Sequence, residues 1–189
     1  GIKILPPYIT AYANNENALY RTRLEALKSV NHSISKITDD YVVLSDCDVI
    51  CNIDLNDMIK NHIENDADIT LAVKKVTLTK EQAKLNVIFE SDKNGRIVDV
   101  QAYPTSFAGE AEVNLNIMVM SRHYLQELVL DAIAHNYTSL TKDIMQKNVE
   151  RRNYRVYRCD GYFACISSPE DYYKSNMELI NKLMETETV

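Results

Sequence analysis

The pattern of apolar residues constrains the fold of this chain more than any other feature. Short β-branched runs, such as 41–44 and 113–120, alternate with longer segments whose apolar residues recur three and four positions apart. The first pattern predicts buried strands, and the second predicts amphipathic helices such as 16–30, 55–65 and the shorter 139–151. Regular alternation of the two predicts an α/β fold with a largely parallel sheet.

Local signals predict where chains turn and helices begin. Residues 85–104 hold two β-rich runs around an Asn-Gly dipeptide, which is favoured in tight turns, and predict an inserted β-hairpin. Residues 154–166 predict two further strands broken by an Asp-Gly dipeptide. Asp54, Ser121 and Ser168 each stand immediately before a helical pattern and are predicted N-caps.

Composition limits the partners of the chain. A formal net charge of −6 over 189 residues argues against nucleic acid or an anionic membrane as the main partner. No apolar run approaches the roughly 20 residues that span a bilayer, and the first residues do not resemble a signal peptide. We therefore expect a single cytoplasmic domain with reduced cysteines, whose C-x3-C and C-x5-C spacings are not typical of structural zinc sites.

Glycine is scarce, which excludes one common class of nucleotide site. The chain has only 4 glycines, and no two of them lie close together in the sequence. A loop that wraps a phosphate needs several glycines, because its backbone must approach the ligand and adopt positive φ angles. These 189 residues therefore contain no Gly-rich phosphate loop.

Two carboxylates follow the predicted strand 41–44. Asp46 and Asp48 would lie beyond the carboxyl end of a buried strand, where ligands bind in open α/β sheets. One interpretation is a Mg²⁺ site facing a nucleotide phosphate, since that ion is often held by one or two carboxylates. The other is turn chemistry, because aspartate favours turns. The residues alone leave both interpretations open.

Several longer runs resemble one family of enzymes. Segments 41–76, 95–104, 114–120, 139–146 and 161–180 together resemble glucose-1-phosphate adenylyltransferase (ADP-glucose pyrophosphorylase), most closely its non-catalytic, GlgD-type bacterial subunit. The resemblance implies a Rossmann-like nucleotidyltransferase domain with a mostly parallel sheet and an inserted hairpin. It also implies that residues 1–189 form one partial domain, without the first strand, the Gly-rich loop and the C-terminal left-handed β-helix of the family.

The resemblance assigns residues to three former subsites, each of which departs from the family pattern. The metal position falls on Asp48 and Cys165, so a thiol replaces the second carboxylate, and a thiol is a poor Mg²⁺ ligand. The nucleotide-facing positions have lost their glycines, and the sugar-phosphate positions have lost a lysine. The nucleotide positions are Thr22, Arg23, Leu24 and Cys47. The sugar-phosphate positions are Ala102, Tyr103, Asn116 and Ser139.

These losses imply a subunit without an intact catalytic set, and without a metal or other cofactor of its own, although the family reaction uses Mg²⁺. We expect a regulatory partner of a catalytic ADP-glucose pyrophosphorylase subunit, in a heterotetramer that serves glycogen synthesis. An active sugar-phosphate nucleotidyltransferase is the alternative, and a binding module is a third. Self-association through an exposed sheet edge is also expected, and Cys47 and Cys165 should lie near each other beside Asp48.

Overall fold

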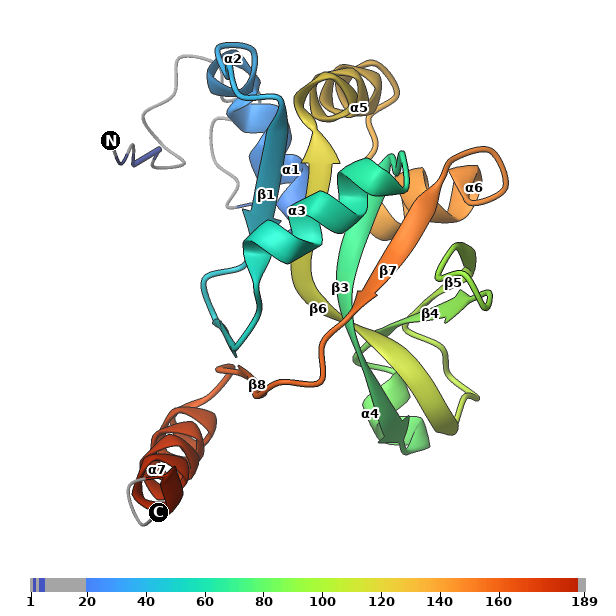
Figure 1. The fold of residues 1–189 in the computed structure, drawn as a ribbon. Helices are drawn as coiled ribbons and strands as arrows, with labels where there is room; N and C mark the ends of the chain where they lie inside the picture. Colours follow the sequence, from blue (N-terminus) through green and yellow to red (C-terminus); the bar gives the residue numbers. More distant parts are fainter. Residues whose placement is uncertain (1, 3, 6–19, 187–189) are drawn as a thin grey trace.

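A computed structural model describes residues 2, 4–5 and 20–186 of the chain, with the side chains of 182–186 excepted. The main body is a six-stranded sheet covered by helices, and a two-stranded ribbon lies beside it (Figure 1). The strands are β1 (Tyr41–Ser45), β2 (Val49–Cys51), β3 (Ile69–Leu78), β4 (Val87–Ser91), β5 (Ile97–Ala102), β6 (Gly109–Ser121), β7 (Tyr154–Arg158) and β8 (Phe163–Cys165).

The helices follow the strands in the alternation that the sequence predicts. Most cover the sheet, whereas the last one extends away from the body beyond the β2–β8 ribbon (Figure 1). They are α1 (Arg23–Ser29), α2 (Asn31–Ile34), α3 (Leu55–Glu64), α4 (Lys80–Ala83), α5 (Arg122–Ala134), the π-helix η1 (Leu140–Met145), α6 (Gln146–Asn148) and α7 (Pro169–Thr186). None of the helices in the described part of the chain is long and apolar enough to cross a membrane.

Strand β6 is the centre of the sheet. It pairs with β3 along 109–120, with β1 along 117–121 and with β4 at 112–113. Because β3 occupies one edge of β6, β1 and β4 must share the other edge, at opposite ends. All three strands are antiparallel to β6, and β7 is parallel to β3, so β1, β3, β4 and β7 point in one direction. The predicted α/β class is confirmed, with a mixed sheet.

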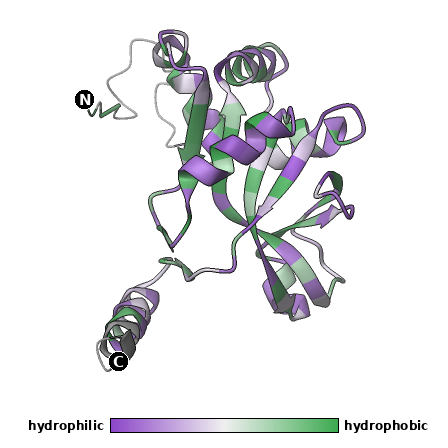
Figure 2. Cartoon of the chain, viewed as in Figure 1, coloured by the Kyte–Doolittle hydropathy of each residue, from purple (hydrophilic) through white to green (hydrophobic). Residues whose placement is uncertain are grey.

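The core has a layer on each face of the sheet. Successive residues of β6 alternate between the layers: Met118 and Met120 pack with α1, α5 and η1, whereas Leu115 and Val119 pack with Met58 of α3. This is the period of two that a buried strand imposes. In Figure 2 the strands are largely apolar and the outer surface of α3 is largely polar, as expected for a helix that buries one face.

Local signals in the sequence placed most helix starts and the hairpin correctly. The side chain of Asp54 accepts hydrogen bonds from Asn56 N and Asp57 N, and Ser121 accepts one from Tyr124 N. Ser168 likewise accepts from Asp171 N. Strands β4 and β5 form the predicted hairpin, and Gly95 in its turn has a φ of 81°.

Two predicted helices differ from the structure. The helix expected at 16–30 begins at Arg23 in the structure. Thr22 and Glu25 form a capping box, which fixes the start of the helix at this point. Residues 16–19 lie outside the described residues. The helix expected at 139–151 is a π-helix followed by a short α-helix, and Ser139 caps it through Lys142 N. A π-helix is rare and is often found at functional sites.

The two layers make a direct prediction about stability. Leu125 and Leu130 lie on the same helix, α5, but Leu125 is 1% exposed and Leu130 is 57% exposed. We expect Leu125→Ala to lower the free energy of unfolding by about 2–5 kcal/mol, because it leaves a cavity in the core. Leu130→Ala should change it by about 0.5 kcal/mol or less. Urea denaturation followed by circular dichroism measures both, and equal effects would contradict this assignment of the core.

Candidate functional site

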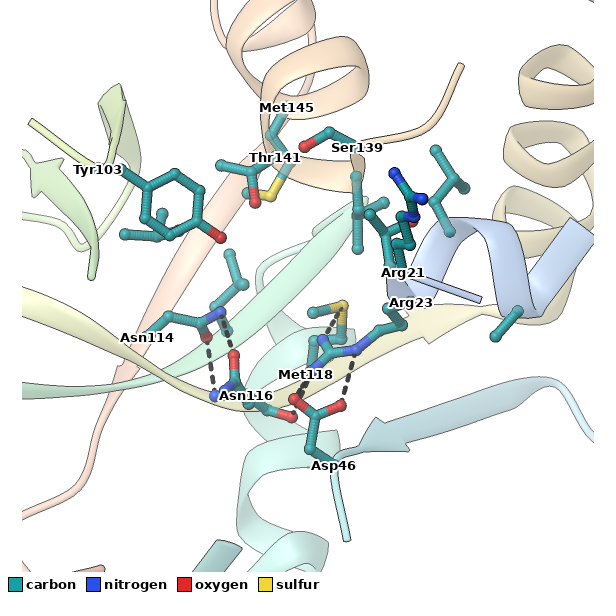
Figure 3. A pocket seen from close by; sticks show the side chains of 16 residues that line it. Arg21, Arg23, Asp46, Tyr103, Asn114, Asn116, Met118, Ser139, Thr141 and Met145 are labelled. Carbon is teal, nitrogen blue, oxygen red and sulfur yellow. Dashed lines mark hydrogen bonds and ion pairs between the residues drawn. The ribbon is translucent and has the colours of Figure 1, made fainter. Parts of the chain in front are cut away.

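A cavity of about 440 Å³ lies beside β6 (Figure 3). It lies along the edge that β6 offers to β1 and β4, in the stretch that neither of these strands pairs with. Its walls come from the start of α1, from β6, from the residue after β5 and from the start of η1. The cavity gathers six residues that the sequence assigned to former nucleotide and sugar-phosphate positions: Thr22, Arg23, Leu24, Tyr103, Asn116 and Ser139.

A bulge in β6 shapes the floor of the cavity. Leu71 of β3 pairs with Met118 and Val73 pairs with Asn114, so four steps along β6 match only two along β3. Asn116, inside this bulge, has a φ of 60°, which is uncommon for a residue with a side chain. The Asn114 side chain supports it, accepting from Asn116 N at 3.1 Å and donating to Asn116 Oδ1 at 3.0 Å. Bulges and backbone strain of this kind concentrate at functional sites.

The Arg23 guanidinium crosses the floor beside this bulge (Figure 3). It lies 2.7 Å from Asp46 Oδ2, donates through Nε to Asp46 Oδ1 at 3.1 Å, and donates to Asn116 O at 3.2 Å. Arg23 is the first residue of α1, so the capping box at Thr22 fixes where its side chain starts. A two-point Arg–carboxylate contact is geometrically specific, and here it occupies a position that the resemblance assigns to a nucleotide.

The opposite wall is polar and uncharged. Tyr103 has a φ of 58°, and Lys142 Nζ lies 5.5 Å from the centre of its ring. Ser139 and Thr141 of the η1 start line the same wall. Backbone N–H groups of Ser139 and Thr138 donate to Asp143, and these bonds lower the pKa of that carboxyl. The wall therefore offers the hydroxyl groups of Tyr103, Ser139 and Thr141, whereas the backbone N–H groups of Thr138 and Ser139 are already bonded to Asp143.

A second group of predicted residues lies outside the cavity, at the β2–β8 ribbon. Val49 pairs with Cys165, and Cys165 Sγ lies 3.7 Å from Asp48 Oδ2. The expected proximity of Cys165 to Asp48 is thus confirmed. Cys47 is exposed and directly precedes Asp48. It lies two positions before Val49, the residue that pairs with Cys165. Ala102, the last residue of β5, pairs with Val87 and does not line the cavity.

Asp46 and Asp48 have different partners and do not form one carboxylate pair. Asp46 is joined to Arg23, whereas Asp48 Oδ1 is buried and, among the described residues, is the only buried side-chain nitrogen or oxygen atom without a hydrogen-bond partner. Burial, then the Asp48 carboxylate, raises the pKa of the Cys165 thiol. The described residues hold no group of three or more His, Cys, Asp or Glu side chains suited to a metal.

These donors do not fit the Mg²⁺ of the family reaction. Mg²⁺ takes oxygen ligands in strict octahedral geometry, and in the pair of Asp48 and Cys165 only the Asp48 carboxylate offers oxygen. The Cys165 thiol is a soft ligand and its raised pKa keeps it protonated near neutral pH. The pair is therefore one hard donor short of the two-carboxylate arrangement that the resemblance implies.

Comparison with known proteins places this geometry in a family. The Nucleotidyl transferase family model matches residues 10–182. This chain belongs to the nucleotidyl transferase family. A crystal structure of HddC from Yersinia pseudotuberculosis has the same fold, with a TM-score of 0.63 and 16% identity over 84% of this chain and 64% of that chain.

Curated relatives point to one branch of that family. The chain is 28% identical to a glucose-1-phosphate adenylyltransferase from Thermosipho melanesiensis over 95% of this chain and 42% of the relative. It is 25% identical to one from Acetivibrio thermocellus over 98% of this chain and 43% of the relative. The chain thus spans less than half the length of these relatives.

Sequence reasoning missed three polar residues that line the cavity, namely Arg21, Asn114 and Thr141, besides the apolar part of its lining. The Asn-Leu-Asn spacing at 114–116 could have indicated Asn114, because residues two apart share a face of a strand. Nothing in the local sequence indicates the ion pair of Arg23 with Asp46, since it needs both the pairing of β1 with β6 and the packing of α1 against the sheet.

The ion pair in the cavity can be measured by a double-mutant cycle of Arg23→Ala and Asp46→Ala. We expect a coupling free energy of about 1 kcal/mol from urea denaturation, because the two side chains are only 20% and 38% exposed and the Arg23 guanidinium is also held by the Asn116 carbonyl. The exposed pair of Lys60 and Glu64 is the control and should give about 0.3 kcal/mol. Additive effects of the Arg23 and Asp46 changes would contradict the contact.

The Asp48–Cys165 contact predicts thiol reactivity. Removing the carboxylate by Asp48→Asn lowers the Cys165 pKa, so more thiolate exists at neutral pH and alkylation by iodoacetamide should be faster. The difference should disappear at alkaline pH, where Cys165 is ionised in both proteins. Mass spectrometry follows each cysteine, and Cys51, whose pKa is raised by burial alone, is the internal control. An unchanged Cys165 rate at neutral pH would exclude the predicted contact.

Proposed function

We propose that this chain is part of a regulatory, catalytically inert subunit that pairs with a catalytic glucose-1-phosphate adenylyltransferase in the cytoplasm. It would act in a heterotetramer and tune the formation of ADP-glucose for glycogen. The proposal rests on the GlgD-type resemblance and on the similarity to relatives that carry that enzyme name.

The ion pair of Arg23 and Asp46 is the observation that supports inertness best. The guanidinium lies across the cavity floor, satisfied by Asp46 and by Asn116 O. A nucleotide entering by the route implied by the family would have to displace this contact, leaving both partially buried charges to find new partners. Phosphoryl-type transfer depends on positioning and charge neutralisation, and this floor is already neutralised internally.

The second support is the loss of hard ligands and of a cation. Cys165 stands where the resemblance implies a metal carboxylate, and Tyr103 stands where it implies a phosphate-binding lysine. Each lost charge contact in a transition state is worth a few kcal/mol, about 10²–10³ in rate. A subunit that keeps its packed core but lacks these charges could still change the conformation of a catalytic partner, which is what a regulatory subunit does.

An active nucleotidyltransferase is the second candidate, and one observation favours it. The unpartnered Asp48 Oδ1 is costly to bury, and a cation brought with a nucleotide would satisfy it. This candidate requires a phosphate-binding loop from outside the 189 residues, because these contain no Gly-rich loop.

Kinetics of the full-length protein test both candidates. Alone, with ATP, glucose 1-phosphate and Mg²⁺, it should turn over at least about 10³-fold more slowly than its catalytic partner. Mixed with that partner, it should shift the half-saturating concentration of the partner's effector by about fivefold or more. An equal mass of an unrelated protein controls for non-specific effects.

Two outcomes would reject the regulatory proposal. One is unchanged kinetics of the partner at every mixing ratio. The other is substantial turnover by the protein alone that Asp48→Asn abolishes, which would establish the enzymatic candidate.

A further inference from the structure

A cluster of cations lies outside the cavity, where the β4–β5 turn meets the start of β7. It comprises Lys93 and Arg96 in the β4–β5 turn, and Arg151 and Arg155 at the start of β7, and is called here the basic corner. None of the four lines the cavity. Positive charge gathered in this way is unusual in a chain whose net charge is −6.

The two inner arginines are direct neighbours. Arg96 and Arg155 are partners in an isolated antiparallel β-bridge, so their side chains start side by side. Both residues are partly buried. Like charges directly opposite one another across a β-pair are destabilising, and partial burial reduces the screening by water that would relieve them.

Among the residues that the structure describes, no carboxylate contacts either of these guanidinium groups directly. Arg96 Nη2 donates to the Glu150 carbonyl at 3.2 Å, and Arg155 Nη2 donates to the Asn94 carbonyl. In the described part of the chain, these are their only side-chain hydrogen bonds. The other nitrogens of each guanidinium fork therefore remain available as donors.

The nearest acid is already engaged by the backbone. Asp92 Oδ1 accepts hydrogen bonds from Asn94 N at 2.8 Å and from Arg96 N at 2.9 Å. These bonds, with smaller contributions from the charges of Arg155 and Arg96, lower the pKa of Asp92. One half-buried turn carboxylate is thus shared by the charges of two arginines. Two further cations are exposed nearby: Lys93 follows Asp92, and Arg151 follows Glu150, whose carbonyl binds Arg96.

Other arginines of the chain are treated differently by the fold. Arg152 lies within 3.2 Å of both Asp68 and Glu127, and Arg158 contacts Glu112 of β6 in the same sheet. Arg96 and Arg155 stand apart because the fold aligns their charges and leaves them without an acidic contact.

We propose that the basic corner binds the phosphate group of a small soluble metabolite, with Arg96 and Arg155 as its principal ligands. A phosphate dianion offers oxygens to two guanidinium forks at once and cancels the repulsion across the bridge. Lys93 and Arg151 would supply longer-range attraction. This site is separate from the cavity, and the proposal does not depend on the proposed regulatory function.

Calorimetric titration of the full chain with inorganic phosphate, against chloride at matched ionic strength, tests the site. We expect one phosphate per chain, and dissociation constants raised about tenfold or more in Arg96→Gln and in Arg155→Gln. Arg155→Lys should give an intermediate loss, because it keeps the charge but not the fork. Arg158→Gln is the matched control, since it removes the same charge from β7 and should bind as the unaltered protein does.

Thermal melts keep the test decisive if a variant folds poorly. Phosphate should raise the melting temperature of the unaltered protein above that in chloride. Absence of both heat and thermal shift would overturn the proposal, as would an equal loss of binding in Arg158→Gln. Retention on vesicles containing phosphatidic acid, without a response to soluble phosphate, would overturn the assignment to a small metabolite.

Discussion

Backbone pairing along β6 is the constraint on which the rest of the structure depends. This strand runs from Gly109 to Ser121 and joins β1, β3 and β4 into one sheet, while its side chains alternate between two core layers. A strand that serves three partners must satisfy each over a different stretch. On one edge of β6, the pairing with β1 and the pairing with β4 leave a short stretch of the strand unpaired between them. The cavity lies beside this stretch.

The bulge at Asn116 shows how this constraint creates a polar site in a mainly apolar strand. Residues on either side of it bury apolar side chains, but within it Asn114 and Asn116 bond to each other and Asn116 O receives Arg23. The ion pair with Asp46 then connects the helix start at Arg23 to the end of β1. The chemistry inside the cavity depends on the particular charges of this chain.

The sequence predicted those features that are determined locally. Periodicity located β1, α3, β3 and β6, and the caps at Asp54 and Ser121 followed from side chains next to the helices they start. It did not predict the bulge, the β2–β8 ribbon or the contact of Arg23 with Asp46, because each depends on pairing between segments distant in the chain. The π-helix was also missed, since its pattern of apolar residues over six positions is close to that of an α-helix.

The short connection between β8 and α7 couples two parts of the molecule mechanically. Only Ile166, Ser167 and Ser168 separate Cys165 from the first residue of α7, and Ile166 N is bonded to Asp48 O at 2.8 Å. Asp171 in the first turn of the helix accepts hydrogen bonds from both serines, which stiffens the joint. Since the same three residues link α7 to the ribbon, a displacement of the helix would first be felt at the backbone beside the Asp48–Cys165 contact.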